Sequence, residues 1–93
     1  MCTTISAKLA IAGAGKGADG WFSVDHAYVG YDHPTQAPAE HAVLLDFVNE
    51  TRGPAARVAI ELTIESARDL VRQLTETLAE ADAYESAQQP VRS

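Results

Sequence analysis

The chain has 93 residues, of which 46% are apolar and 22% are charged, and its formal net charge at pH 7 is −6. This length suits one domain with a modest core, and the composition is that of a globular protein rather than a disordered one. The 7 basic residues are scattered and form no stripe that could neutralise phosphates, which argues against nucleic-acid binding. An anionic membrane surface would also repel this chain.

The single cysteine, Cys2, excludes an internal disulfide and fits a reducing, cytoplasmic compartment. The start of the chain lacks a basic segment, and glycine soon interrupts its apolar stretch, so we expect neither a signal peptide nor a membrane span. Removal of Met1 would expose Cys2 as an N-terminal residue with both amine and thiol, which can act as a nucleophile or chelate a metal. An incidental role for this cysteine is the simpler interpretation.

Four successive segments have the pattern of β-strands: residues 4–12, 21–31, 41–50 and 57–63. The first alternates between apolar and polar residues, and the second is rich in aromatic and β-branched residues. A flexible connection of eight residues, GAGKGADG, is expected between them, and a Gly-Pro turn precedes the fourth strand. The inward-facing side chains are expected to include Ile5, Ala7, Leu9, Ile11, Val43, Leu45, Phe47, Val58, Ile60 and Leu62.

From Ile64 onward the apolar residues recur at steps of three and four, which predicts an amphipathic helix with Thr63 as its N-cap. The last residues lack this periodicity, so a single domain at 1–83 and a flexible tail at 84–93 are expected. The predicted fold class is α+β, a four-stranded antiparallel sheet with one C-terminal helix packed on one face. Because one helix cannot cover both sides of the partly apolar sheet, we expect a homodimer.

The stretch GKGADG matches the G-x-G-x-x-G pattern of dinucleotide-binding proteins from Gly15 to Gly20. That fingerprint requires a helix next, whereas the following residues WFSV predict a strand, so nucleotide binding is disfavoured. The segment is instead interpreted as a hairpin loop. Lys16 at its tip and Trp21 at its base could close over a ligand as a lid.

The stretch YDHPTQAPAEH, residues 31–41, concentrates two of the three histidines and two carboxylates in a loop stiffened by prolines. An imidazole titrates near neutrality, so His33 or His41 is a candidate base, with Glu40 and Asp32 as orienting or acidic groups. The alternative is that these groups only cap strand ends and satisfy loop amides. The residues expected to contact a small-molecule ligand are Trp21, Phe22, Tyr31, Lys16 and His26.

Three functions are therefore consistent with the sequence. The first is an enzyme that uses cofactor-independent acid–base chemistry to condense, cyclise or isomerise a small metabolite. The second is a metal- or ligand-binding module without turnover, in which a divalent metal would be held by His33, His41 and Cys2, although the spacing of the two histidines is not specific for metal. The third is a homodimeric interaction protein.

The start MCT and the segments GKGADGWF, YDHPTQAPAEH and GPAARVAIEL resemble a family of short bacterial proteins classed as a domain of unknown function. The resemblance covers most of residues 1–80 and is most specific around Trp21 and the stretch from His33 to His41. It implies a small stand-alone protein, gives weight to these same residues and supplies no mechanism.

Overall fold

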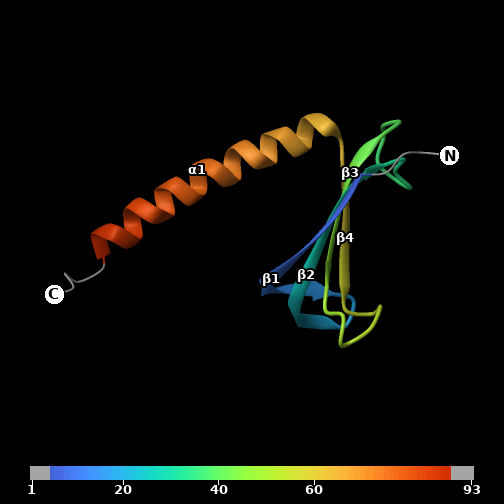
Figure 1. Ribbon diagram of the computed structural model, residues 1–93, viewed down its shortest axis with the longest axis horizontal. Helices are drawn as coiled ribbons and strands as arrows, with labels where there is room; N and C mark the ends of the chain where they lie inside the picture. Colours follow the sequence, from blue (N-terminus) through green and yellow to red (C-terminus); the bar gives the residue numbers. More distant parts are fainter. Residues whose placement is uncertain (1–4, 89–93) are drawn as a thin grey trace.

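The protein consists of a four-stranded sheet and one long helix in a computed structural model that describes residues 5–88 (Figure 1). All neighbouring strands are antiparallel, and their order in the sheet follows their order in the chain. The α+β fold expected from the sequence is confirmed. The elements are β1 (Ile5–Gly17), β2 (Gly20–Asp32), β3 (Ala42–Val48), β4 (Arg57–Leu62) and α1 (Ile64–Gln88).

The connection between the first two strands differs from the expected flexible loop. β1 continues through the glycine-rich stretch and pairs with β2 as far as Gly17 opposite Gly20, so only Ala18 and Asp19 lie outside the ladder. Gly20 has a φ of 108°, a conformation that glycine adopts without strain and that a tight hairpin turn requires. The expected mobile lid is therefore wrong, because the glycines extend a paired ribbon instead of interrupting it.

The glycine at position 15 also lets this ribbon approach the core closely. A β-carbon built on Gly15 would lie 3.1 Å from a methyl group of Val24 and 3.4 Å from the ring of Phe22. A glycine inside a strand commonly marks such a close approach. The sequence signal that suggested flexibility is thus a packing requirement.

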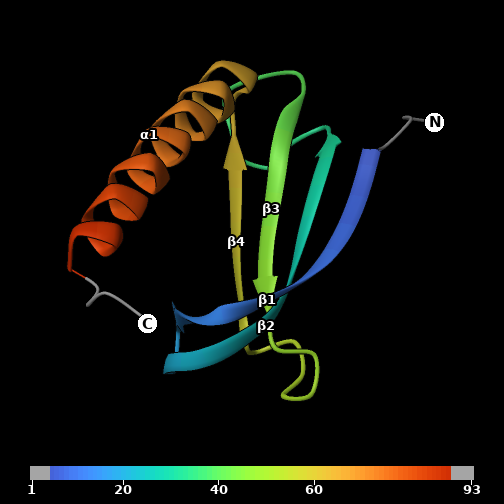
Figure 2. The same ribbon diagram turned by 60° about the vertical axis from the view of Figure 1, so that its left-hand side comes forward.

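The hairpin bends where the pairing register shifts between Ala10 and Gly13, because β1 contains one residue more than β2 at this point. Beyond the bend the hairpin end curls across the sheet, as Figure 2 shows. Phe22 and Val24 are carried onto the core, whereas His26 lies on the other side of the sheet. A strict alternation along β2 would place His26 on the face of Phe22 and Val24. It does not, because the buried positions of β2 change from a step of two to a step of three after Val24.

The register defines two faces that differ in chemistry. The "apolar face" consists of Ile5, Ala7, Leu9, Ala27, Val29, Tyr31, Val43, Leu45, Phe47, Val58, Ile60 and Leu62. The "polar face" consists of Ser6, Lys8, Ala10, His26, Tyr28, Gly30, Leu44, Asp46, Val48, Arg57, Ala59 and Glu61. The apolar face carries no charged residue, whereas charges of both signs occupy the polar face.

The helix begins at the predicted position. The Thr63 hydroxyl accepts a hydrogen bond from the Ser66 amide at 3.1 Å, and the Thr63 carbonyl accepts one from the Ala67 amide at 2.9 Å, which confirms the N-cap. The helix ends at Gln88, so residues 84–88 of the expected tail are helical, and residues 89–93 lie outside the described part of the chain. No helix among residues 5–88 is both long enough and apolar enough to cross a membrane.

The helix does not lie across the sheet as expected. Figure 1 shows that it leaves the end of β4 and runs away from the strands, giving the molecule an extent of 58 × 32 × 21 Å. At the junction only Thr63 separates β4 from α1, and both its carbonyl and its hydroxyl are engaged in capping the helix. Among residues 5–88, the buried apolar side chains are therefore confined to the sheet and the loops: Phe22, Val24, Ala27, Ala42 and Ala56.

Candidate functional site

The residues predicted to form one site lie at two ends of the sheet. Lys16 and Trp21 face each other in the hairpin end of β1 and β2, and Phe22 follows them. The predicted acid–base residues Asp32, His33, Glu40 and His41 lie at the opposite end, at and between the ends of β2 and β3. Cys2 lies outside the described residues. Of the predicted ligand contacts, Tyr31 lies beside the predicted catalytic groups, whereas Lys16, Trp21 and Phe22 lie at the other end of the sheet.

The loop between β2 and β3 stacks three rings. The ring centroids of Tyr31 and His41 are 5.3 Å apart with an angle of 17° between their planes. Those of His41 and His33 are 4.5 Å apart, with an angle of 28°. The loop histidines are thus in contact as the sequence suggested, with Tyr31 as the third member of the stack.

The carboxylate of Glu61 on β4 holds the loop in place. It accepts hydrogen bonds from the backbone amides of Thr35 at 2.8 Å, Gln36 at 2.7 Å and Ala37 at 3.0 Å. These bonds stabilise the charged form and lower the pKa of Glu61 below its ordinary value of 4.5, against a smaller opposing effect of burial. A residue remote in sequence therefore orders the loop, together with its two prolines.

The ring of His33 has a defined orientation. Its Nδ1 lies 2.9 Å from the carbonyl oxygen of Glu40, which can only accept, so Nδ1 carries the proton and Nε2 has a free lone pair. The Oδ1 of Asp32 accepts from the His33 backbone amide at 2.7 Å rather than contacting an imidazole. His33 is consequently the better-oriented base of the two loop histidines.

The same stack does not suit a metal shared by His33 and His41. The lone pair of an imidazole lies in the plane of its ring, and planes inclined by only 28° at 4.5 Å do not aim their lone pairs at a common point between them. Within residues 5–88 no group of three or more His, Cys, Asp and Glu side chains is placed to hold a metal ion. The proposed metal ligand Cys2 lies outside this range.

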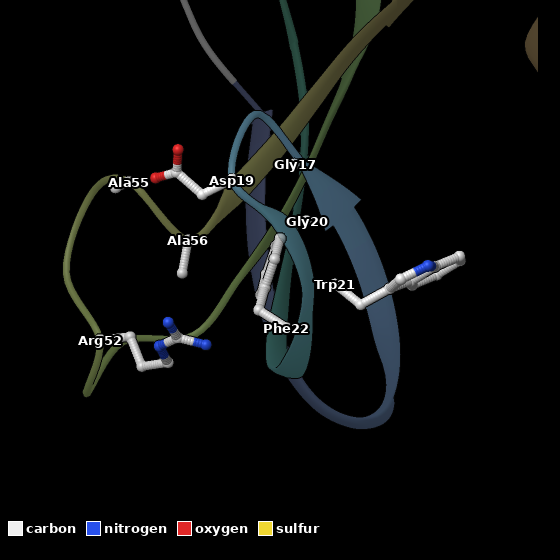
Figure 3. Close-up of a pocket in the computed structure, with 8 residues that line it drawn as sticks. All are labelled: Gly17, Asp19, Gly20, Trp21, Phe22, Arg52, Ala55 and Ala56. Atoms are coloured by element: carbon white, nitrogen blue, oxygen red, sulfur yellow. The ribbon is translucent and has the colours of Figure 1, made fainter.

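The hairpin end contains two hollows. One of about 60 Å³ is bounded by Asp19, Phe22, Arg52 and Ala56 and is large enough only for water (Figure 3). In Figure 3 the Trp21 side chain points away from the others that line this hollow. The second hollow, of about 390 Å³, opens onto the apolar face. Its lining includes Lys16, Trp21, Ile11, Val24, Phe47 and Val58.

The densest group of titratable side chains lies on and beside the polar face. We call it the Glu50 cluster, and it consists of Lys8, Asp25, His26, Tyr28 and Glu50. The two carboxylate oxygens of Glu50 lie 3.1 and 3.0 Å from the ammonium nitrogen of Lys8, and one of them accepts a hydrogen bond from the Tyr28 hydroxyl. The other lies 3.3 Å from Nδ1 of His26. One carboxylate thus contacts an ammonium, a phenol and an imidazole.

These contacts shift the pKa values of the cluster in opposite directions. The Tyr28 hydroxyl, followed by Lys8, lowers the pKa of Glu50 below 4.5. The hydrogen bond to Glu50 raises the pKa of Tyr28 above 10.0 and that of Lys8 above 10.5. The contact with His26 lowers the pKa of Asp25 below 3.8. Near neutral pH the cluster therefore pairs an ionised carboxylate with a protonated phenol and a protonated amine.

His26 is oriented by two carboxylates. Its Nδ1 lies 3.0 Å from Oδ1 of Asp25 and 3.3 Å from Oε1 of Glu50. Because ionised carboxylates only accept hydrogen bonds, Nδ1 carries the proton and Nε2 has the free lone pair. A carboxylate that holds an imidazole in one tautomer is the arrangement that prepares a general base.

Asn49 places Glu50 at the end of β3. Its side-chain oxygen accepts from the Thr51 amide and hydroxyl and from the Arg52 amide, at 3.1, 2.6 and 3.1 Å. Its side-chain nitrogen donates to the carbonyl of Ser23 at 2.9 Å. This buried amide ties the turn after β3 to β2, so the backbone on which Glu50 sits is rigid.

An open hollow of about 330 Å³ adjoins the cluster, lined by Tyr28, Glu50 and Arg57 among others. Arg57 is held by Asp46, whose carboxylate lies 2.6 Å from its Nε. A second hollow of about 330 Å³ extends along the sheet from Tyr28 to Asp32, so Tyr28 borders both. The polar face therefore offers room for a small molecule beside titratable groups.

Comparison with known proteins defines the relatives of this chain. The model of a family of unknown function, DUF6295, matches residues 1–88. The chain belongs to that family. The match confirms the resemblance to an uncharacterised family that the sequence motifs suggested. No curated protein and no solved structure matches the chain.

The residues that the structure brings together overlap only in part with those that the sequence singled out. His26 was predicted as a ligand contact, whereas Lys8, Asp25, Tyr28, Glu50 and Glu61 were not predicted to have a functional role. The available signal was the period of two. Lys8, His26 and Tyr28 occupy polar positions in predicted strands, but their meeting also depends on the extra residue of β1, since the register of the hairpin turn alone would pair Lys8 with Val29.

Proposed function

We propose that the protein catalyses cofactor-independent acid–base chemistry on a small molecule at the polar face, as a condensation, cyclisation or isomerisation. The observation that carries this proposal is the Glu50 carboxylate, which contacts Lys8, His26 and Tyr28 at once. Such reactions need a positioned base, a positioned acid and a hollow, and the polar face supports all three. A cytoplasmic location is part of the proposal and is supported by the single cysteine of the chain.

Each group of the cluster has a role that follows from its contacts. His26 accepts the substrate proton at Nε2, and the resulting imidazolium is stabilised at Nδ1 by Asp25 and Glu50. Tyr28 is a hydrogen-bond donor whose raised pKa keeps it protonated near neutral pH. Lys8 provides a positive charge for an anionic group of the substrate.

His33 is a second candidate base, and one observation favours it. The Glu40 carbonyl fixes its tautomer so that Nε2 is free, on a loop that Glu61 and two prolines hold in place. This version keeps the loop residues of the sequence hypothesis, with His33 rather than His41 as the base. The two versions differ in which histidine abolishes activity when it is replaced.

Proton abstraction can be tested without knowing the substrate. A panel of small ketones, keto acids and hydroxy acids is incubated with the protein in D₂O, and loss of C–H signals is followed by proton NMR. The proposal predicts enzyme-dependent exchange for at least one compound class. Exchange should fall at least about tenfold in His26→Gln, since general bases contribute factors of about 10² to 10⁴.

The variants separate the candidate sites. Tyr28→Phe should also lower exchange, whereas Arg72→Gln on the helix is a control that leaves the polar face unchanged. Activity that survives His26→Gln but is lost in His33→Gln would assign the chemistry to the loop. Absence of exchange and of ligand-induced shifts at His26 and His33 across the panel would contradict the proposal.

A further inference from the structure

The helix presents an apolar stripe that no other part of the described chain covers. Every helix residue from Arg68 to Ala87 is exposed, including Val71 at 63%, Leu74 at 52% and Leu78 at 62%. These residues lie at helical spacing along one side, with Leu70 and Ala67 in the same stripe. A helix of this kind normally buries such a stripe against another element, because propensity alone stabilises isolated helices only marginally.

The apolar face of the sheet is partly uncovered in the same chain, although Phe47 and Val58 pack against the core at the hairpin end. Ile5, Leu9, Val29 and Ile60 are all exposed large hydrophobic residues on this face, and Ile5 is 64% exposed. The hollow of about 390 Å³ below Trp21 opens onto the same side. Figures 1 and 2 both show the helix and the curled hairpin end on one side of the sheet. The two uncovered surfaces thus border the same open space.

The helix leaves the sheet at a short junction. Thr63 is the only residue between β4 and α1, and its carbonyl and hydroxyl both accept hydrogen bonds from the first turn. From Arg68 to Ala87 the helix is exposed along its whole length, so within residues 5–88 the apolar stripe has no covering partner.

We propose that a second copy of the chain covers the apolar face, with the helix of each copy lying across the sheet of the other. Both complementary surfaces belong to one chain, so a twofold axis satisfies both at once and leaves no open end. The dimensions agree, because the stripe from Ala67 to Ala81 is about 22 Å long and the 7-residue strand β3 spans about 23 Å. The dimer extends the proposed function without depending on it.

The uncovered area suffices for a stable pair. Among residues 5–88, ten large hydrophobic residues are exposed, nearly all on the stripe or on the apolar side of the sheet. Burying about 50 Å² of each would remove about 500 Å² per chain and about 1,000 Å² per pair, before flanking atoms are counted. Stable interfaces bury about 1,200 to 2,000 Å² in total, so flanking residues need supply only a minor part.

The charges of the helix are arranged to permit this contact. Glu76, Asp69 and Arg72 lie on the side opposite the stripe, and Arg72 pairs with Asp69 at 2.7 Å on that side. Glu85 falls in line with the stripe near the end of the helix, so the contact with the uncharged apolar face is expected over the part from Ala67 to Ala81. The polar face of each sheet, with the Glu50 cluster, would remain on the outside.

The test combines mass in solution with cross-linking. By analytical ultracentrifugation from 1 to 100 μM, the wild-type chain should approach twice its 9.9 kDa mass and dissociate on dilution. Leu74→Glu with Leu78→Glu should shift the midpoint of association at least about a hundredfold, since two buried large side chains are lost. Ala79→Glu with Ala83→Glu adds the same charge to the opposite side and should leave association unchanged.

Cross-linking then identifies which surfaces meet. Two variants with single cysteines, Leu74→Cys and Val29→Cys, are prepared in a Cys2→Ser background, mixed and treated with a short thiol cross-linker. The proposal predicts a product between the two different chains. A wild-type monomer at 100 μM would overturn the proposal, as would cross-links only between two Leu74→Cys chains. A chain that carries both Leu74→Cys and Val29→Cys provides a further check, because a link within that one chain would also overturn it.

Discussion

The two faces of one sheet are built from the same strands, yet they differ in almost every property. The apolar face has no charged residue and exposes large hydrophobic side chains, whereas the polar face joins Lys8, Tyr28 and Glu50 through hydrogen bonds. Because side chains alternate along a strand, two successive residues point to opposite faces of the sheet. Our two proposals assign different roles to the two faces, association to the apolar face and chemistry to the polar face.

The largest loss of stability is expected from a substitution in the core on the apolar side. Phe22→Ala removes the largest buried side chain, which contacts Val24 and Ala56, and should lower the free energy of unfolding by about 3 to 5 kcal/mol. Chemical denaturation measures this change. Trp21→Ala is the matched control, since Trp21 is 69% exposed, and a larger loss in that variant would contradict the assignment of the core.

The next largest effect is expected at Asn49, which supports the polar side. Asn49→Ala removes the side-chain partner of the Ser23 carbonyl and the Thr51 amide, while the Arg52 amide keeps the Asn49 carbonyl, and it should destabilise the protein by about 1 to 3 kcal/mol. Asn49→Asp retains the acceptor but not the donor, so its thermal stability should be intermediate. Equal stability of all three proteins would contradict the described role.

Much of the fold could be predicted from the sequence. Period-two alternation predicted the strands, and the change to steps of three and four after Thr63 predicted the start of the helix, because both signals depend on neighbouring residues. The extra residue of β1 near Ala10 was not predictable, since a bulge has no periodic signal, and it changed the faces of Phe22 and His26 relative to one another. The side of the helix that faces solvent depends on partners and could not be read from periodicity.

The candidate site was predictable to a smaller extent. The ring contacts of His33 and His41 followed from their shared short loop, whereas the amides held by Glu61 join residues far apart in sequence. Likewise, Lys8 and Glu50 meet only because β1, β2 and the end of β3 are neighbours. Local patterns identify candidate residues, and strand register decides which of them meet.

A third prediction concerns pH and the Glu50 cluster. The lowered pKa of Glu50 contributes stability above about pH 4.5 that is lost as pH falls through the folded-state value. The raised pKa values of Tyr28 and Lys8 contribute stability below about pH 10 that is lost as pH rises through theirs. Glu50→Gln should therefore be less stable than wild type at pH 7, with the difference shrinking at both extremes.

Thermal melts of both proteins from pH 3 to 11 measure this difference. Asp69→Gln removes a carboxylate from the exposed side of the helix and serves as the control, with an almost constant difference from wild type across the range. A difference between Glu50→Gln and wild type that does not vary with pH would show that the cluster is not coupled as described.

The smallest effect is expected at His41. Its ring lies between those of Tyr31 and His33, but its replacement by Gln leaves the Glu61 contacts intact and should change stability by less than about 0.5 kcal/mol. The tautomer of His33, with the proton on Nδ1, should be unchanged in ¹⁵N chemical shifts because the Glu40 carbonyl sets it. A loss of 1 kcal/mol or more would make His41 a structural member of the loop instead.

The central claim, that a second copy covers the apolar side while the polar face stays open, is tested most directly by amide hydrogen exchange at two concentrations. The account predicts slow exchange across residues 68–87 at 100 μM, faster exchange at 1 μM, and little change in the Thr35 to Ala37 amides held by Glu61. Fast exchange along the whole helix at both concentrations, or slow exchange that is independent of concentration, would contradict it.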